Sequence, residues 1–381
     1  MNMDFFNIEE RAKNIQTEEN ETELNELVQK FEDGHFSELL SETKPLYEKY
    51  QNDPQVIHFL SLIDIASHIQ ISESDKAMPI IEKIYEEDDN AIEDLIVYGH
   101  FAYLTDYKLA RKILSDAVKQ MDEQDQYDES KRTSALFLLA ESEEKLQKYG
   151  RAIKYYEQTL EYFERDQGIE VNRSIILYLL VKLGNLYSIK NETSHAIDYF
   201  DRAIDLATKE NELQLKIDSL ISVGKIHGKR KEYNQAANYL RLAISLLEDS
   251  SIDNEWMYIE SYTEMAYNHF DHGDFDDAIP YYEKAIRHLN KLYQYPKRDF
   301  GMILMQYAFS LENQKKPNIK KAGRNYERAI EELEEAEEFE LLETALGDVI
   351  KFFDETNQQK KKKVYEEKFV LITNEKSNRV H

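Results

Sequence analysis

The stretch LGNLYSIKNETSHAIDYFDRAI, residues 183–204, decides the fold, because its spacing of small residues recurs along the chain. In it Gly184 is followed by Ala196, Phe200 and Ala203. Identical offsets occur in two further copies: Gly224, Ala236, Leu240 and Ala243, then Ala266, Ala278, Tyr282 and Ala285. Small residues let two helix backbones approach closely, and a bulky residue one turn away fills the space to the next pair. The pattern therefore predicts stacked pairs of antiparallel helices.

Weaker copies extend the pattern in both directions. The alanine of the second helix recurs at positions 110, 152, 196, 236, 278 and 322, and degenerate units precede and follow this series. Such a unit cannot bury its apolar face alone, so neighbouring units must stack, and end units with polar outer faces are expected. We predict an all-α fold, a right-handed α-solenoid of about nine antiparallel helix pairs whose terminal pairs are degenerate.

These positions resemble the signature of the tetratricopeptide repeat (TPR). The segments at residues 183–204 and 265–286 carry the small residue, the aromatic or histidine three positions later, and the alanine–aromatic–alanine series of the second helix. Two features differ from the family pattern. The tryptophan of the first helix is missing, and most repeat spacings are about 40–44 residues, so the helices must be longer than usual.

Composition limits the class of protein. The 381 residues include Gly 11, Pro 6 and Cys 0, which favours helices with short connections and excludes a disulfide framework or a thiolate metal site. The net charge of −27 opposes binding to nucleic acid or to anionic membranes. Neither a signal peptide nor a membrane-spanning run is found, so we expect a soluble cytoplasmic protein.

The domain organisation follows from a break in the pattern. Residues 121–131, MDEQDQYDESK, are polar, acidic and without periodicity, and the repeat spacing changes across them. We predict an N-terminal helical section with degenerate TPR-like pairs at residues 1–125, a TPR solenoid at residues 126–371 and a flexible tail at residues 372–381.

Candidate catalytic and metal-binding groups are weak. His269 and His272 lie near Asp271 and Asp274, which could form a metal site, but the same residues are typical of a packed histidine followed by a turn. Motifs of phosphate-binding loops, serine hydrolases and zinc proteases are missing. We therefore predict no catalytic residue, no cofactor and no metal, and an enzyme is the less favoured interpretation.

The binding surface is expected on the concave face, which the first helices of a solenoid line. Counting from the small residue of each unit gives the groove positions, which mix polar groups with aromatic and sulfur-containing side chains. The predicted groove residues are Tyr178, Asn185, Lys225, Glu260, Tyr267, Phe270, Met302, Met305 and Phe309. Such a surface suits an extended peptide or protein segment, which needs hydrogen bonds to its backbone and apolar pockets for its side chains. Asn185 and Lys225 are the expected polar anchors.

The long repeats, the acidic charge and the helical N-terminal section resemble the Rap-type response-regulator aspartate phosphatases and related bacterial peptide-pheromone receptors. This resemblance implies a peptide-responsive regulator whose TPR groove binds a short signalling peptide. A passive TPR scaffold and a phosphatase acting on a phosphorylated response regulator remain alternatives. The sequence leaves open the ligand, the oligomeric state and whether the N-terminal section is a separate effector module.

Overall fold

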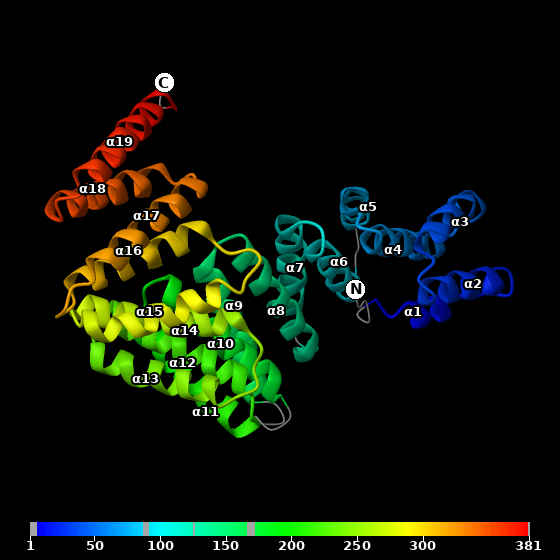
Figure 1. The fold of residues 1–381 in the computed structure, drawn as a ribbon. Coiled ribbons are helices and arrows are strands. Elements are labelled where there is room, and N and C mark those ends of the chain that lie inside the picture. Colours follow the sequence, from blue (N-terminus) through cyan, green and yellow to red (C-terminus); the bar gives the residue numbers. More distant parts are fainter. Residues whose placement is uncertain (1–5, 87–90, 125, 166–171, 380–381) are drawn as a thin grey trace. The chain divides into compact units, whose positions relative to one another are not determined.

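The structure is a computed structural model that describes residues 6–86, 91–124, 126–165 and 172–379. These residues form nineteen α-helices and no strand (Figure 1). The helices are α1 (Ile8–Ile15), α2 (Glu21–Glu32), α3 (Phe36–Lys49), α4 (Pro54–Gln70), α5 (Ser74–Glu86), α6 (Ile92–Tyr103), α7 (Tyr107–Asp122), α8 (Glu129–Lys145), α9 (Tyr149–Arg165), α10 (Arg173–Ile189), α11 (Thr193–Glu210), α12 (Leu213–Lys229), α13 (Tyr233–Glu248), α14 (Glu255–His272), α15 (Phe275–Leu289), α16 (Lys297–Asn313), α17 (Ile319–Glu335), α18 (Phe339–Glu355) and α19 (Gln359–Arg379).

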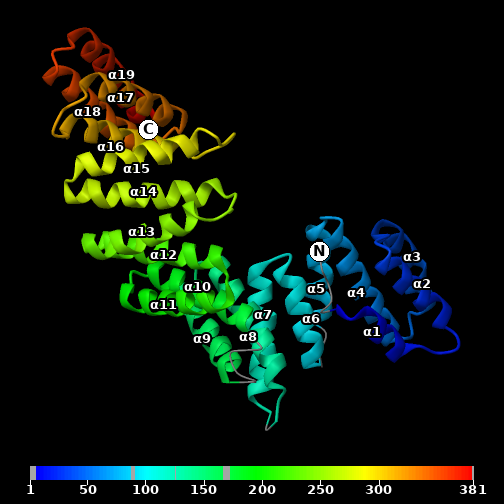
Figure 2. The ribbon, with the colours of Figure 1, turned by 60° about the horizontal axis from the view of Figure 1, so that its bottom comes forward.

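After α1, the described helices form nine consecutive pairs, from α2–α3 to α18–α19, which confirms the predicted all-α repeat fold. Each of the helices α12 to α17 packs against the next one, so that this part forms a regular stack (Figures 1 and 2). The first helices of successive pairs also touch, as α12 and α14 do and α14 and α16 do. First helices therefore share one face of this stack.

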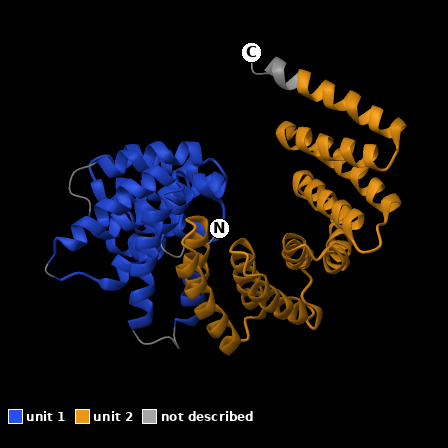
Figure 3. Cartoon of the chain, turned by 90° about the vertical axis from the view of Figure 1, so that its left-hand side faces the viewer, with its two compact units in different colours: residues 1–179 blue, residues 180–381 orange. Residues whose placement is uncertain are grey.

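The chain divides into two compact units, residues 1–179 and 180–381 (Figure 3). The division falls inside α10. The predicted boundary at residue 125 lies outside the described residues, and a section ending there remains a prediction. In the second unit, the segment predicted as a tail from residue 372 continues as part of α19 up to Arg379.

Packing within the pairs follows the small residues. The recurring alanines of the second helices, from Ala110 to Ala322, are all fully buried. A β-carbon added at Gly184 would lie 2.8 Å from the ring of Phe200, and one at Gly224 would lie 2.6 Å from Leu240. The small residue of the first helix therefore gives room to the bulky residue of the second helix, as the sequence pattern requires.

The turns inside most pairs share one helix-ending motif. Seven described turns hold a residue with a positive φ angle: Gly34, Ser72, Gln147, Asn191, Lys231, Gly273 and Asn357. The amide of the following residue donates to the carbonyl five residues before it, as Glu232 does to the His227 carbonyl at 2.9 Å. This is the Schellman motif, which satisfies carbonyls at the end of the first helix. It also brings the side chains of residues i and i+5 together.

Within the described residues, we find no helix with the length and apolar character needed to cross a membrane.

Candidate functional site

The first helices of the second unit enclose a cavity with a volume of about 660 Å³. Its walls are formed by α12, α14 and α16, together with the connection between α15 and α16. The lining combines apolar groups such as Ile259 and Phe300 with carboxylates, lysines and amides. A cavity of this size and mixed chemistry suits a ligand of several groups, not a single ion.

A smaller cavity of about 150 Å³ adjoins the first one. Met302 and Gln306 of α16 line both cavities, so the two are neighbouring parts of one surface. The smaller cavity is lined mainly by apolar side chains, including Phe270, Met305 and Phe309. We call the surface formed by both cavities the groove.

Seven of the nine predicted residues line the groove. Lys225, Glu260, Tyr267 and Met302 line the larger cavity, and Phe270, Met302, Met305 and Phe309 line the smaller one. Asn185 is exposed on α10 and lines neither cavity. Tyr178 also lies on α10, in the first unit, where its hydroxyl donates to Glu141 at 2.6 Å. The role of all nine residues in binding remains a prediction.

The charged groups of the groove centre on Lys225. Its ammonium lies 3.1 Å from a carboxylate oxygen of Glu264 and 3.4 Å from one of Glu260. Burial opposes the charge of Lys225, but the two carboxylates outweigh it and raise its pKa. Burial also raises the pKa of Glu264, although Lys225 acts in the opposite direction. Lys225 therefore pairs with two carboxylates, and the larger cavity as a whole is lined by four carboxylates against three cations, Lys225, Lys229 and Arg298.

Asp218 belongs to the same acidic region. It lies on α12, one of the first helices, and carries no ion pair among the described residues. Burial, followed by repulsion from Glu260, raises the pKa of Asp218 to about 6. A cationic ligand group placed near Asp218 and Glu260 would relieve this repulsion.

On α14, two residues that line the larger cavity hold buried polar atoms without a hydrogen-bond partner among the described residues. They are Thr263 Oγ1 and Asn268 Oδ1, and their residues are only 8% and 5% exposed. The amide nitrogen of Asn268 donates to the Tyr233 carbonyl at 3.1 Å, which fixes the side chain. An unpaired buried acceptor is costly, so a ligand that donates to these oxygens after their side chains turn toward the cavity would gain affinity.

Sequence reasoning missed Asn268, Glu264 and Trp256. The first two stand two positions from Ala266, where the repeat register predicts interior packing. Trp256 lies at the start of α14, lines the larger cavity and remains 46% exposed. That it is the only tryptophan of the chain is the one signal that the sequence could have offered.

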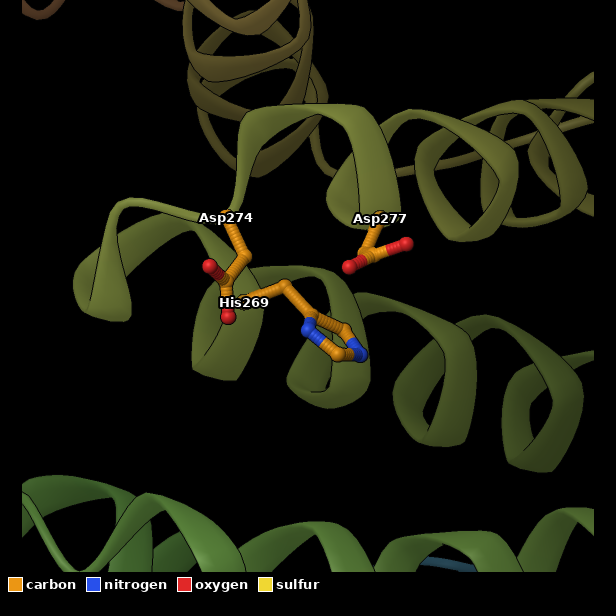
Figure 4. A group of neighbouring side chains, drawn as sticks. All are labelled: His269, Asp274 and Asp277. Atoms are coloured by element: carbon orange, nitrogen blue, oxygen red, sulfur yellow. The ribbon is translucent and has the colours of Figure 1, made fainter.

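The turn between α14 and α15 brings His269 together with Asp274 and Asp277 (Figure 4). The sequence pointed to Asp271 as a neighbour of His269, whereas the structure places Asp277 there. Burial lowers the pKa of His269, despite the two nearby carboxylates, which act to raise it. The ring of His269 stacks on Tyr281, with 5.7 Å between the ring centroids.

Comparison with known proteins identifies the class. The sequence model of the tetratricopeptide repeat matches residues 133–165, 177–210 and 259–287. These segments are tetratricopeptide repeats, as the spacing of small residues predicted. No curated protein sequence is significantly similar to the chain.

Solved structures define the fold more closely. The apo form of RapI aligns over 97% of this chain and 98% of its own, with a TM-score of 0.61 and 13% identity. Aspartyl phosphate phosphatase F from Bacillus subtilis aligns over 97% and 94%, with a TM-score of 0.52 and 16% identity. The apo quorum sensor NprR from B. thuringiensis aligns over 91% and 99%, with a TM-score of 0.51 and 15% identity. The chain thus has the fold of the Rap and NprR TPR proteins, which confirms the predicted resemblance in architecture.

Proposed function

We propose that the groove of α12, α14 and α16 binds an extended segment of a peptide or protein. The observation that carries this proposal is the cavity of about 660 Å³ itself, with its mixed polar and apolar lining, to which Thr263 and Asn268 belong. Thr263 Oγ1 and Asn268 Oδ1 are buried without a partner, and the backbone amides of an extended segment are donors that would pair with them once the two side chains turn toward the cavity. The segment would then pair two groups that the folded chain leaves unpaired.

The smaller cavity would accept an apolar side chain of the same segment. Its volume of about 150 Å³ is of the size of one large aliphatic or aromatic residue, and its walls are largely aromatic and sulfur-containing. Phe270, Phe275 and Phe309 form a cluster of edge-to-face contacts beside it, with centroids 5.5–5.6 Å apart. Rigid aromatic walls of this kind give an apolar side chain a defined position.

The charge of the groove favours a segment with a basic part. Glu260 and Glu264 share Lys225, and Asp218 lies close enough to Glu260 to be repelled by it, so a ligand cation near these carboxylates would be favoured. Lys225 could still contact one acidic or carbonyl group of the ligand.

Regulation by such a segment is the function that the fold favours. The chain shares its fold with RapI and with the quorum sensor NprR over nearly its whole length. We infer a cytoplasmic regulator that responds to a peptide. A passive scaffold would use other surfaces and would leave the groove without a ligand.

Dephosphorylation of a response regulator is a second candidate, favoured by the fold shared with aspartyl phosphate phosphatase F. Purified chain is mixed with phosphorylated response regulators of its host, and loss of the phosphorylated form is followed on phosphate-affinity gels. A rate above that of each regulator alone would support this activity. If the chain changes the dephosphorylation rate of none of the regulators, phosphatase activity is excluded for them.

The peptide proposal is tested with an array of short peptides of random sequence. Binding is read from the fluorescence of Trp256, the single tryptophan, which lines the larger cavity. Thr263→Val keeps the shape of the side chain and removes the hydroxyl, so it should weaken the best peptides by roughly 5- to 100-fold, the usual effect of an unpaired polar partner. Thr208→Val, at an exposed position of α11, is the matched control. Equal affinity of both variants would place binding elsewhere.

A further inference from the structure

The turn between α14 and α15 places three side chains with metal-binding atoms close together. His269 comes from the last turn of α14, Asp274 stands between the helices, and Asp277 lies in the first turn of α15. One nitrogen of His269 and one oxygen of each aspartate all lie within 4.8 Å of one another. In Figure 4 the imidazole lies between the two carboxylates. None of these residues lines either cavity of the groove.

The backbone of the turn explains why His269 and Asp274 meet. Gly273 has a φ angle of 87°, and the amide of Asp274 donates to the His269 carbonyl at 2.8 Å. The turn between α12 and α13 has the same hydrogen bond, from Glu232 to His227. In that turn the Glu232 carboxylate also bonds the His227 ring nitrogen Nδ1, at 2.5 Å. A histidine in this motif is therefore normally satisfied by the acid five residues later.

His269 breaks this rule. Aspartate is one methylene shorter than glutamate, and Asp274 Oδ2 accepts instead from His272 Nδ1 at 2.7 Å. Among the described residues, neither ring nitrogen of His269 forms a hydrogen bond, although the side chain is partly buried and held by its stack on Tyr281. Asp277 adds a second carboxylate at the position that Gln235 occupies in the α12–α13 turn.

We propose that His269, Asp274 and Asp277 bind a divalent transition-metal ion of the zinc class. Zinc accepts imidazole nitrogen at about 2.0–2.1 Å and carboxylate oxygen at about 2.0–2.2 Å. The two carboxylates balance the charge of the ion, and small rotations of the exposed aspartates would bring their oxygens to this range. Calcium and magnesium prefer sets made of oxygen alone, so the imidazole selects against them.

The bound metal ion would link the end of α14 to the start of α15. Phe270 follows His269 directly, and Phe275 follows Asp274; both rings contact Phe309, which lines the smaller cavity. The bound ion would therefore hold one wall of the groove in place. The metal site itself does not depend on the proposed peptide function.

The test uses the full chain, freed of metal with a chelator and titrated with Co²⁺ and Zn²⁺ by calorimetry. Cobalt also reports its ligands through visible absorption. We expect one high-affinity ion per chain that is not displaced by Ca²⁺ or Mg²⁺. His269→Gln and Asp277→Asn should each weaken binding at least tenfold. Asp271→Asn, an exposed neighbour outside the cluster, is the matched control and should bind as the parent does.

A second measurement covers the case in which a variant fails to fold. Addition of Zn²⁺ to the unaltered chain should shift the imidazole ¹⁵N resonances of His269 in NMR spectra and leave those of His227 in place. Absence of a bound ion in the parent, or equal binding by the parent and a folded His269→Gln variant, would overturn the proposal. A zinc shift at His227 without one at His269 would do the same.

Discussion

Single glycines in the first helices show how residue volume fixes the contact between two helices. Gly224 and Gly228 lie one turn apart on α12, yet their surroundings differ. A β-carbon at Gly224 would lie 2.6 Å from Leu240, whereas one at Gly228 would meet nothing within 4 Å. The repeat pattern alone distinguishes them, because only Gly224 stands twelve residues before a buried alanine, Ala236.

We predict that Gly224→Ala lowers the free energy of unfolding by roughly 1–3 kcal/mol, because the close contact forces overpacking. Gly228→Ala should leave it unchanged or raise it by about 0.5–1 kcal/mol, since alanine is the better helix former. Urea unfolding followed by circular dichroism measures both. Equal effects of the two substitutions would show that the assigned register is wrong.

The raised pKa of Asp218 has a consequence for stability. Its pKa of about 6 in the folded chain exceeds the ordinary value of 3.8, so the folded state binds the proton more tightly. This contribution to stability is complete below the ordinary value and is lost as the pH rises through about 6. Asp218→Asn should therefore raise the melting temperature relative to the parent at about pH 7.5 and lose that advantage at about pH 4. Asp205→Asn, exposed on α11, serves as the control. A difference between parent and Asp218→Asn that is the same at both pH values would contradict this account.

The sequence predicted groove residues correctly where the repeat register determines which side chains are buried. It missed residues that line the larger cavity at other positions of the register. Lys225, Glu260 and Tyr267 follow the register and line the larger cavity. Asn268 faces the interior by the same register, and the interior is open at that place. Cavities depend on the sum of neighbouring side-chain volumes, which no local pattern contains.

At the scale of the element, the turns between the two helices of a pair share one backbone conformation although their sequences differ. Gly273 and Lys231 occupy the same left-handed position in successive turns, with φ angles of 87° and 61°. Glycine adopts this conformation without steric cost, whereas other residues are strained there. A glycine such as Gly273 lets the sequence predict a turn of this kind. A lysine at the same position, as at Lys231, does not, because lysine is not typical of the left-handed conformation.

We expect Gly273→Ala to cost about 1–2 kcal/mol, although its surroundings are open, because the cost lies in the backbone alone. Lys231→Gly should be neutral or stabilising in the corresponding turn. Gly150→Ala is the control, since Gly150 is equally open and has no positive φ angle. Thermal melts of the three variants test this, and unchanged stability of Gly273→Ala would refute the assignment of strain.

Aromatic packing joins the last helix pair to the pair before it. Phe352 of α18 is buried, with its ring centroid 4.8 Å from that of Tyr326 in α17. Phe352→Ala should cost roughly 3–5 kcal/mol, the usual range for an aromatic core residue. Because a repeat stack is stabilised by neighbour contacts, faster amide exchange should be confined to α17, α18 and α19. Val364→Ala, exposed on α19, should leave exchange unchanged. Faster exchange throughout α12 to α15 would argue for one globally cooperative core.

At the scale of the whole molecule, the nine pairs could be predicted from the sequence because each pair repeats the same local contact. The limits of the two compact units could not be predicted from the sequence, because the division inside α10 depends on contacts summed over many residues. The size of the larger cavity also escaped prediction, because it depends on the spacing between α12, α14 and α16. The N-terminal section at residues 1–125 remains a prediction in its role as an effector module.

Radical footprinting with mass spectrometry tests the central claim, peptide binding in the groove, most directly. The chain is oxidised with and without the best peptide from the array, and the modification of each side chain is compared. Trp256, Met302 and Phe309 line the groove, so their oxidation should fall on binding. Leu242 on α13 and Tyr127 in the first unit are exposed outside the groove and should be oxidised as before. A bound peptide that leaves Trp256, Met302 and Phe309 as reactive as in the free chain would contradict the proposal.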